Sequence, residues 1–202
     1  MARIILVRHG KTDWNKELRI QGGSSDTLLN EEGRRQAENA ASRLSQRSIQ
    51  AIYSSPLKRA METAKIIARY HNLEVVVENS LREVEAGELE GVTSAELGKR
   101  FSEILTQDGV SYRVPGGESL VDLRRRSWDF IQNINRKHTD GELVVVSHYF
   151  AILAIICSAL MLPLSSITRF RLSTGCISII NLDEKEARLE LFNDTGYLVQ
   201  FS

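Results

Sequence analysis

Short apolar runs alternate with longer helical patterns along most of this chain, and this alternation constrains the fold more than any other feature. The run at 3–7 has the composition of a strand that is buried on both faces, and the run at 143–146 that of another buried strand. The runs at 51–54 and 73–77 also predict strands. Between them, apolar residues recur at helical spacing. Strands that alternate with helices form parallel sheets. We therefore predict an α/β fold of three layers, in which a mostly parallel sheet carries helices on both faces.

Capping residues mark where several of the helices start. Asn30 and Ser119 are favourable N-cap residues. Ser55, followed by Pro56, predicts a helix whose first residue is the proline. Near the end of the chain, residues 176–182 and 188–192 predict a hairpin that turns around 183–185.

The segment 79–117 departs from the alternating pattern. It contains a run of glutamates, a Thr93-x-x-Glu96 capping pair and the turn Pro115-Gly116-Gly117. We interpret it as a small cap inserted over one edge of the sheet. The prediction is a single domain over residues 1–202 with a cap-like insertion at about 79–117.

Composition excludes several classes of protein. An apolar fraction of 42% with 26 basic and 26 acidic side chains excludes a disordered chain, and the even balance argues against nucleic-acid or membrane-surface binding. The apolar stretch 149–162 is too short to span a bilayer and predicts a buried helix. The only cysteines, Cys157 and Cys176, lie in core-like runs, as expected in a reducing compartment. We expect a cytoplasmic monomer or homodimer without a signal peptide.

Polar residues follow three of the predicted strands directly. Arg8 and His9 follow the first strand, Arg59 lies near the start of the helix after the second, and His148 follows the fourth. The carboxyl ends of parallel strands lie at one edge of a sheet, where open α/β sheets bind ligands. These side chains are therefore expected to converge in one crevice.

Such a crevice suits a phosphoryl group. Guanidinium groups match the oxygens of phosphate, and a helix N-terminus adds backbone N–H donors. An imidazole that is kept neutral by neighbouring cations is a competent nucleophile toward phosphorus. Glu83, which lies on the loop after the third strand, has the chemistry of a proton donor to the leaving oxygen.

Six blocks of the sequence, in order, resemble the signature of the histidine phosphatase superfamily, the phosphoglycerate-mutase-like proteins. The first two are Leu6-Val7-Arg8-His9-Gly10-Lys11-Thr12-Asp13-Trp14-Asn15 and Gly22-x-x-x-Asp26-x-x-Leu29-x-x-x-Gly33-x-x-Gln36-Ala37. The third and fourth are Ser54-Ser55-Pro56-Leu57-Lys58-Arg59-Ala60-x-x-Thr63-Ala64 and Leu81-Arg82-Glu83 with Gly87-x-x-Glu90-Gly91. The last two are Pro115-Gly116-Gly117-Glu118-Ser119 and Val144-Val145-Val146-Ser147-His148. The resemblance implies the phosphoglycerate-mutase-like fold.

The resemblance also implies roles for individual residues. His9 would be the nucleophile that becomes phosphorylated, and Glu83 would be the proton donor. His148 would complete the catalytic set and help hold the phosphoryl group, together with Arg8, Asn15 and Arg59. The implied reaction needs neither a metal nor another cofactor. The expected partner is a small phosphorylated metabolite.

Two positions depart from the family pattern. Tyr149 stands where glycine is common; its backbone N–H remains, so we place it among the phosphate-binding residues, with a ring that lines or narrows the pocket. Lys11 replaces a frequent Glu or Gln and adds positive charge at the rim. We assign the substrate rim to four further residues, Thr12, Gln21, Arg82 and Arg113, and name Arg100 as another specificity candidate.

Three alternative functions stay open at this stage. A zinc site formed by Asp13, His9, His148 and Glu83 is possible from residue type, although neighbouring arginines would repel the cation. A phosphoglycerate mutase would return the phosphoryl group to a product. Family mutases carry a longer insertion with paired arginines and a Tyr where Ala86 stands, so hydrolysis is favoured. A non-catalytic phosphate-binding module on the same fold is the third.

Overall fold

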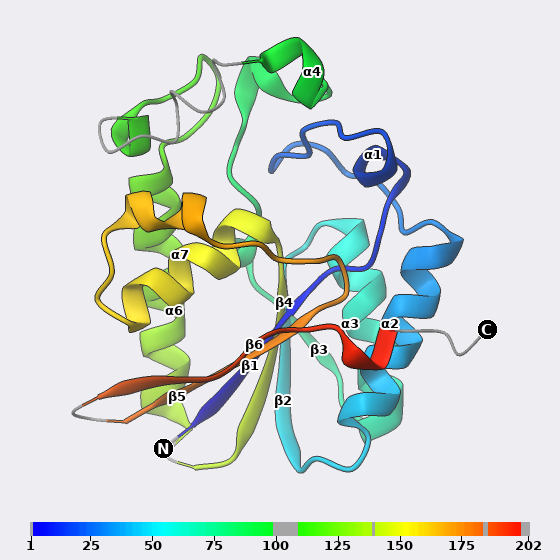
Figure 1. Cartoon of the computed structure of the whole chain (residues 1–202). Helices are drawn as coiled ribbons and strands as arrows, with labels where there is room; N and C mark the ends of the chain where they lie inside the picture. The colour runs from blue at the N-terminus through cyan, green and yellow to red at the C-terminus, as the bar shows by residue number, and fades with distance from the viewer. Residues whose placement is uncertain (1, 99–108, 139, 184–185, 199–202) are drawn as a thin grey trace.

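A mixed sheet runs through the protein in the order β3-β2-β4-β1-β5-β6 (Figure 1). The structure, a computed structural model, describes residues 2–98, 109–138, 140–183 and 186–198. The strands that it defines are β1 (Arg3–Arg8), β2 (Ile49–Ser54), β3 (Val75–Val77), β4 (Glu142–Ser147), β5 (Ile177–Leu182) and β6 (Ala187–Asp194). β1 to β4 are parallel, and β5 and β6 are antiparallel additions at one side. The predicted mostly parallel sheet and the C-terminal hairpin are confirmed, and residues 184 and 185 of its turn lie outside the described residues.

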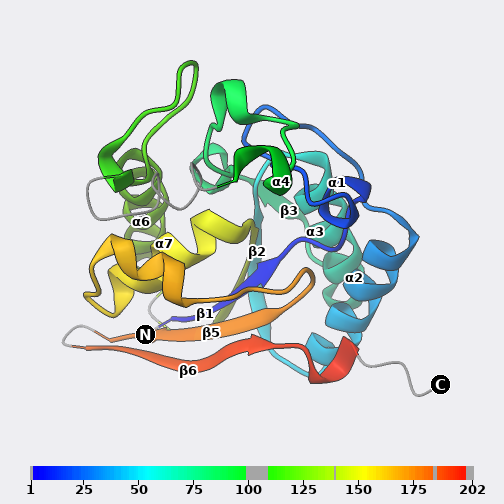
Figure 2. The ribbon, with the colours of Figure 1, turned by 45° about the horizontal axis from the view of Figure 1, so that its top comes forward.

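Helices cover both faces of this sheet, which confirms the three-layer prediction. Figure 2 shows α2 (Glu31–Leu44) and α3 (Lys58–His71) on one side, with α6 (Leu120–Lys137) and α7 (Tyr149–Ala159) on the other. The predicted N-caps Asn30 and Ser119 open α2 and α6. In the described part of the chain, no helix is long and apolar enough to cross a bilayer.

The continuous apolar run of β1 follows from having a helical layer on each face. Ile4 and Leu6 belong to the core beneath α6 and α7, whereas Ile5 and Val7 belong to the core beneath α2 and α3. Successive side chains of a strand point to opposite faces, so both sets must be apolar. Each layer is therefore anchored by alternate residues of the same strand.

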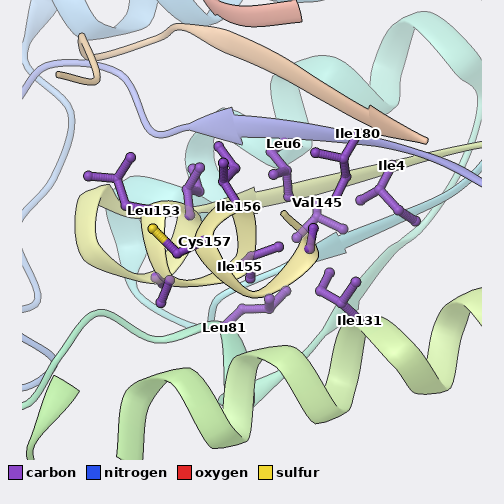
Figure 3. Packing of buried hydrophobic residues seen from close by; sticks show 14 of the residues in the cluster. Ile4, Leu6, Leu81, Ile131, Val145, Leu153, Ile155, Ile156, Cys157 and Ile180 are labelled. Atoms are coloured by element: carbon purple, nitrogen blue, oxygen red, sulfur yellow. The ribbon is translucent and has the colours of Figure 1, made fainter. Parts of the chain in front are cut away.

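The helix α7 is apolar around its circumference because it lies between the sheet and α6 (Figure 3). Ile156 and Cys157 are among its fully buried residues, and Cys176 is buried elsewhere in the same core. Both thiols are free, and burial raises the pKa of each to about 11. They behave as small apolar side chains here.

The predicted start of α3 is wrong by two residues. The helix begins at Lys58, and its N-cap is Leu57, which makes no side-chain capping bond. The Lys58 N–H instead donates to Asp26 Oδ1 at 2.8 Å. Ser55 is not the N-cap because the helix starts three residues after it; its hydroxyl accepts the Leu57 N–H at 3.4 Å and pairs with His148 Nε2 at 2.8 Å. Two strand bounds also differ, since β2 begins at Ile49 and β3 is shortened to Val75–Val77.

The cap lies above the carboxyl edge of the sheet and includes chain that the sequence did not predict to join it (Figure 1). Within 79–117 the structure defines η1 (Asn79–Leu81), η2 (Gly87–Leu89), α4 (Ser94–Leu97) and η3 (Gly109–Ser111), and the Thr93–Glu96 capping box is present. The loop after β1 forms α1 (Asp13–Lys16) and pairs with this segment, as the Ile20 N–H donates to Val92 O at 2.9 Å. Arg100 lies outside the described residues.

Two short helical turns complete the description, η4 (Leu164–Arg169) and η5 (Gly196–Leu198). The loop that follows η4 returns across the carboxyl edge of the sheet before it enters β5 (Figure 2). It therefore forms another boundary of the region where β1 and β4 end.

Candidate active site

The carboxyl ends of β1, β2 and β4 lie side by side, which brings their terminal polar residues together. The His9 N–H donates to Ser147 O and the Ser55 N–H donates to Val146 O, both at 3.1 Å. These bonds continue the parallel ladders one residue beyond the strands. The ring centres of His9 and His148 are 5.1 Å apart. The predicted convergence of the two histidines is confirmed.

His9 is held as a neutral imidazole with a defined tautomer. Its Nδ1 lies 2.7 Å from Gly10 O, and because a carbonyl oxygen only accepts hydrogen bonds, Nδ1 carries the proton. The lone pair of Nε2 is then unused. Burial lowers the pKa of His9 well below its usual value, and the positive charges of Arg59 and Arg8 lower it further. An imidazole in this state has the lone pair that a nucleophile requires at neutral pH.

His148 is fully buried beside His9 and is also kept neutral. Its Nε2 pairs with Ser55 Oγ at 2.8 Å, and Nδ1 has no hydrogen-bond partner in the described residues. Burial lowers the pKa of His148 well below its usual value, with Arg59 and His9 as further causes. A buried polar atom without a partner is a place where a ligand atom is expected.

Two arginines supply positive charge that no carboxylate of the described residues hydrogen-bonds. Arg59 is fully buried and donates to Ser25 O and Gly22 O, while its Nε has no partner. Burial lowers the pKa of Arg59 to about 10, so it stays charged at neutral pH. Arg8 donates to Leu172 O at 2.5 Å, and its Nε also lacks a partner. Buried guanidinium groups whose N–H donors are not hydrogen-bonded to a carboxylate favour binding of an anion.

Glu83 is buried and shares the site with these cations. Its two oxygens accept the backbone N–H groups of Val84 at 2.9 Å and Phe150 at 3.2 Å. Burial raises the pKa of Glu83 above its ordinary value, although the two N–H bonds and the arginines oppose the shift. A carboxyl with a raised pKa retains its proton longer and is suited to protonate a leaving group.

The loop that carries Glu83 is fixed by a residue that sequence reasoning missed. Arg126 of α6 donates to the carbonyl oxygens of Ser80 at 2.8 Å and of Arg82 and Glu83 at 2.9 Å, and it pairs with Glu118. In the sequence it is the last of three consecutive arginines, which look like a solvated run. Helical periodicity alone does not show that one of them faces a loop.

A cavity of about 710 Å³ opens beside these groups, a size within the roughly 300–1,000 Å³ typical of ligand sites. Six of the residues predicted for the site line it: Arg8, His9, Asn15, Gln21, Glu83 and Tyr149. Lys11 also lines it and pairs with Glu32. His148 and Arg59 lie behind this wall, because neither has exposed surface.

Tyr149 lines the cavity with its ring, as expected, but its hydroxyl donates to Phe170 O at 3.0 Å. The guanidinium carbon of Arg8 lies 5.1 Å from the centre of that ring, close enough for a cation–π contact. The Tyr149 N–H belongs to the first turn of α7 and has no acceptor in the part of the chain that the structure describes. It is thus available to an anion.

Three of the four residues predicted for the rim lie elsewhere. Arg82 pairs with Glu85 and donates to Gly23 O, and Arg113 pairs with Asp122 at 2.8 Å. Neither arginine lines the cavity. Thr12 is buried and caps α1. Its hydroxyl also lies 2.9 Å from Gln21 Oε1. The buried Nε2 of Gln21 has no hydrogen-bond partner in the described chain.

The structure does not assemble the zinc ligands that residue type allowed. Asp13 Oδ1 accepts a hydrogen bond from Asn30 Nδ2, and Asp13 does not line the cavity. No group of three or more His, Cys, Asp or Glu side chains in the described residues is arranged to hold a metal ion. The neighbouring guanidinium groups also oppose a cation.

Comparison with known proteins identifies relatives over nearly the whole chain. A model of the histidine phosphatase superfamily (branch 1) matches residues 4–195. Phosphoserine phosphatase 1 of Hydrogenobacter thermophilus is 33% identical, with 100% of this chain and 96% of that protein covered. The probable phosphoglycerate mutase GpmB of Salmonella choleraesuis is 36% identical, with 92% and 87% covered.

Solved structures give the same result. A mutant phosphoserine phosphatase from Entamoeba histolytica, in complex with phosphoserine, superposes with a TM-score of 0.90 at 28% identity. The match covers 98% of this chain and 100% of that one. The sheet, the helical layers and the cap are thus shared with an enzyme that was solved with a small phosphomonoester bound.

Proposed function

The chain belongs to branch 1 of the histidine phosphatase superfamily, and we propose that it hydrolyses phosphomonoesters of small metabolites through a phosphohistidine formed on His9. One observation carries this proposal. A neutral imidazole with an unused Nε2 lies among two guanidiniums without a carboxylate partner and a buried carboxyl with a raised pKa. These are the nucleophile, the anion-binding groups and the acid that phosphoryl transfer needs.

In the first step the Nε2 lone pair of His9 attacks phosphorus. The bond from phosphorus to the ester oxygen breaks, and the proton of Glu83 moves to that oxygen, so an alcohol leaves. Arg8 and Arg59 compensate the negative charge of the equatorial oxygens, with the Asn15 side chain and the Tyr149 N–H as further donors. His148, whose Nδ1 has no hydrogen-bond partner in the part of the chain that the structure describes, binds another of these oxygens.

In the second step water replaces the alcohol. The Glu83 carboxylate takes a proton from the water, the water oxygen attacks phosphorus, and the bond from phosphorus to Nε2 breaks. Inorganic phosphate leaves, and His9 and Glu83 are restored to their starting states. The same carboxyl thus serves as acid and then as base.

Mutase activity is the second candidate, because one relative of 36% identity carries a mutase name. A mutase would deliver the phosphoryl group from His9 to a hydroxyl of the product rather than to water. The chain lacks the longer insertion with paired arginines that family mutases carry, which supports hydrolysis.

The test is phosphate release by the purified chain from an aryl phosphate and from 3-phosphoglycerate, in the presence of EDTA. We expect release from the wild type, an acid-labile phosphoryl adduct on His9, and loss of both in His9→Ala. His71→Ala is the matched control, because His71 lies at the end of α3 and does not line the cavity. Conversion of 3-phosphoglycerate to its positional isomer without phosphate release would establish the mutase. Absence of both reactions would leave a binding module.

A further inference from the structure

The cavity carries more positive charge than the phosphoryl chemistry uses. Three cationic side chains line it in addition to Arg8. Lys11 pairs with Glu32 at 2.9 Å, and Arg19 pairs with Glu17 at 2.5 Å. Arg171 is exposed, lines the cavity and has no acidic or hydrogen-bonding partner among the described residues. One cation at the mouth is therefore left without a counter-ion.

The backbone on both sides of Arg171 is fixed. The preceding residue, Phe170, accepts the hydrogen bond of the Tyr149 hydroxyl at 3.0 Å. The following residue, Leu172, accepts that of Arg8 Nη1 at 2.5 Å. Arg171 thus lies between two anchor points, one of which is made by a guanidinium assigned to the phosphoryl group. Because Arg8, His9 and Arg171 line the same cavity, an anion held by Arg171 would share that cavity with the phosphoryl group.

The structure gives no comparable role to the preceding arginine, two residues earlier in the chain. Arg169, at the end of η4, is exposed and does not line the cavity. Thr168 and Thr174, which flank this stretch, do line it. The Thr168 hydroxyl donates to Ser165 O at 3.0 Å, so this side of the cavity offers an oxyanion the Arg171 guanidinium and the Thr174 hydroxyl.

We propose that Arg171 binds a second anionic group of the substrate, so that phosphomonoesters bearing a carboxylate or a second phosphate are preferred over those without one. This inference rests on the proposed phosphatase function. A guanidinium binds either anion through paired N–H donors, and the two sources are separated by the substrates chosen below. Arg171 is then a specificity-determining residue that acts on binding and not on the chemical step.

The test compares kcat/KM across four substrates. Phosphoserine and 3-phosphoglycerate carry a carboxylate, fructose 1,6-bisphosphate carries a second phosphate, and glycerol 3-phosphate carries neither. In the wild type we expect a preference for one of the two anionic classes over glycerol 3-phosphate. In Arg171→Ala that preference should fall by about tenfold or more, as expected for the loss of a hydrogen bond between charged groups, mainly through KM. Arg171→Lys should restore part of it, and Arg169→Ala should retain the whole.

A binding measurement separates this inference from the proposed function. Calorimetry on His9→Ala, with and without Arg171→Ala, gives Kd for phosphoserine, fructose 1,6-bisphosphate and glycerol 3-phosphate in the absence of turnover. If the wild type hydrolyses none of the substrates but Arg171→Ala still weakens one anionic class selectively, the phosphatase proposal fails and the Arg171 site stands. Equal effects of Arg171→Ala on all substrates and ligands, or no effect on any, would overturn the Arg171 proposal.

Discussion

Replacing Arg126 with methionine should loosen the loop that carries Glu83. The guanidinium donates to three carbonyl oxygens of that loop, those of Ser80, Arg82 and Glu83, and it forms an ion pair with Glu118. Methionine keeps an unbranched apolar stem of similar length but has no N–H donor. Arg126→Met therefore removes the polar contacts while retaining most of the packing.

The expected loss of stability depends on which groups Arg126→Met leaves without a partner. Removing one partner of a buried charge pair destabilises a protein by roughly 3–5 kcal/mol. The Arg126 side chain is 24% exposed, so water can solvate part of what is left. The Glu118 carboxylate also keeps the hydrogen bond that it accepts from the Glu85 N–H. We therefore expect the lower end of the range, about 3 kcal/mol of the free energy of unfolding.

Urea unfolding measures this loss, and the adjacent Arg125 provides the control. With a slope of about 2–3 kcal/mol per molar urea, a loss of about 3 kcal/mol lowers the unfolding midpoint by about 1 M or more. Arg125 is 73% exposed and, among the described residues, pairs only with Asp122, at 3.4 Å, so Arg125→Met should change the stability by no more than about 0.5 kcal/mol.

The catalytic activities of Arg126→Met and Arg125→Met should differ in the same way as their stabilities. Arg126→Met should lower kcat for alkyl phosphates under conditions where the variant is still folded, because Glu83 is no longer held in place; Arg125→Met should not. Equal midpoints for the two variants would refute the reasoning that the Arg126 network stabilises the loop. A stable Arg126→Met enzyme with wild-type kcat would refute its positioning role.

Two further predictions concern the acid and the packing beneath His9. Because burial raises the pKa of Glu83, its proton is lost only at higher pH than in a free carboxyl, and kcat/KM for an alkyl phosphate should fall as pH rises through that raised pKa. Glu83→Gln should lower kcat/KM for the alkyl phosphate about 10²–10⁴-fold and abolish this decline. The loss should be smaller on an aryl phosphate, because its leaving group needs no proton. An unchanged pH profile would argue against Glu83 as the acid. A Cβ at Gly10 would lie 2.2 Å from Gly33 O, a backbone atom, so thermal unfolding of Gly10→Ala should show a loss of about 2 kcal/mol or more. Gly196→Ala, whose Cβ meets only an ordinary contact at 3.4 Å, should stay near wild type, and equal stability of the two variants would contradict the packing argument.

Sequence patterns a few residues long predicted the strands and helix starts that depend on uniform burial or on contacts close in the chain. The run through Ile4 and Ile5 predicted a doubly buried strand because helical layers on both faces demand apolar residues in succession. The N-caps Asn30 and Ser119 predicted helix starts because a cap bonds N–H groups two or three residues away. Ser55 was wrong as the N-cap because α3 starts only at Lys58, whose N–H donates to Asp26 from a distant part of the chain.

The rim of the cavity was predicted poorly for a related reason. Arg82 and Arg113 were candidates by residue type, but each pairs with a carboxylate that the fold brings near, Glu85 and Asp122. Arg171 showed no signal in the sequence, since an exposed arginine in a loop has no periodicity that marks it. A long flexible cation is directed by its neighbours in space, which spacing along the chain does not reveal.

The amino-acid sequence alone determined the order of strands and helices, since burial and capping act over a few residues. It also placed Arg8, His9 and His148 at the carboxyl ends of strands that become neighbours. Only the tertiary structure decided that Arg126 holds the Glu83 loop and that Arg171 faces the cavity without a counter-ion. Those outcomes depend on contacts between residues distant in the chain, whose partners are chosen by packing and charge balance in three dimensions.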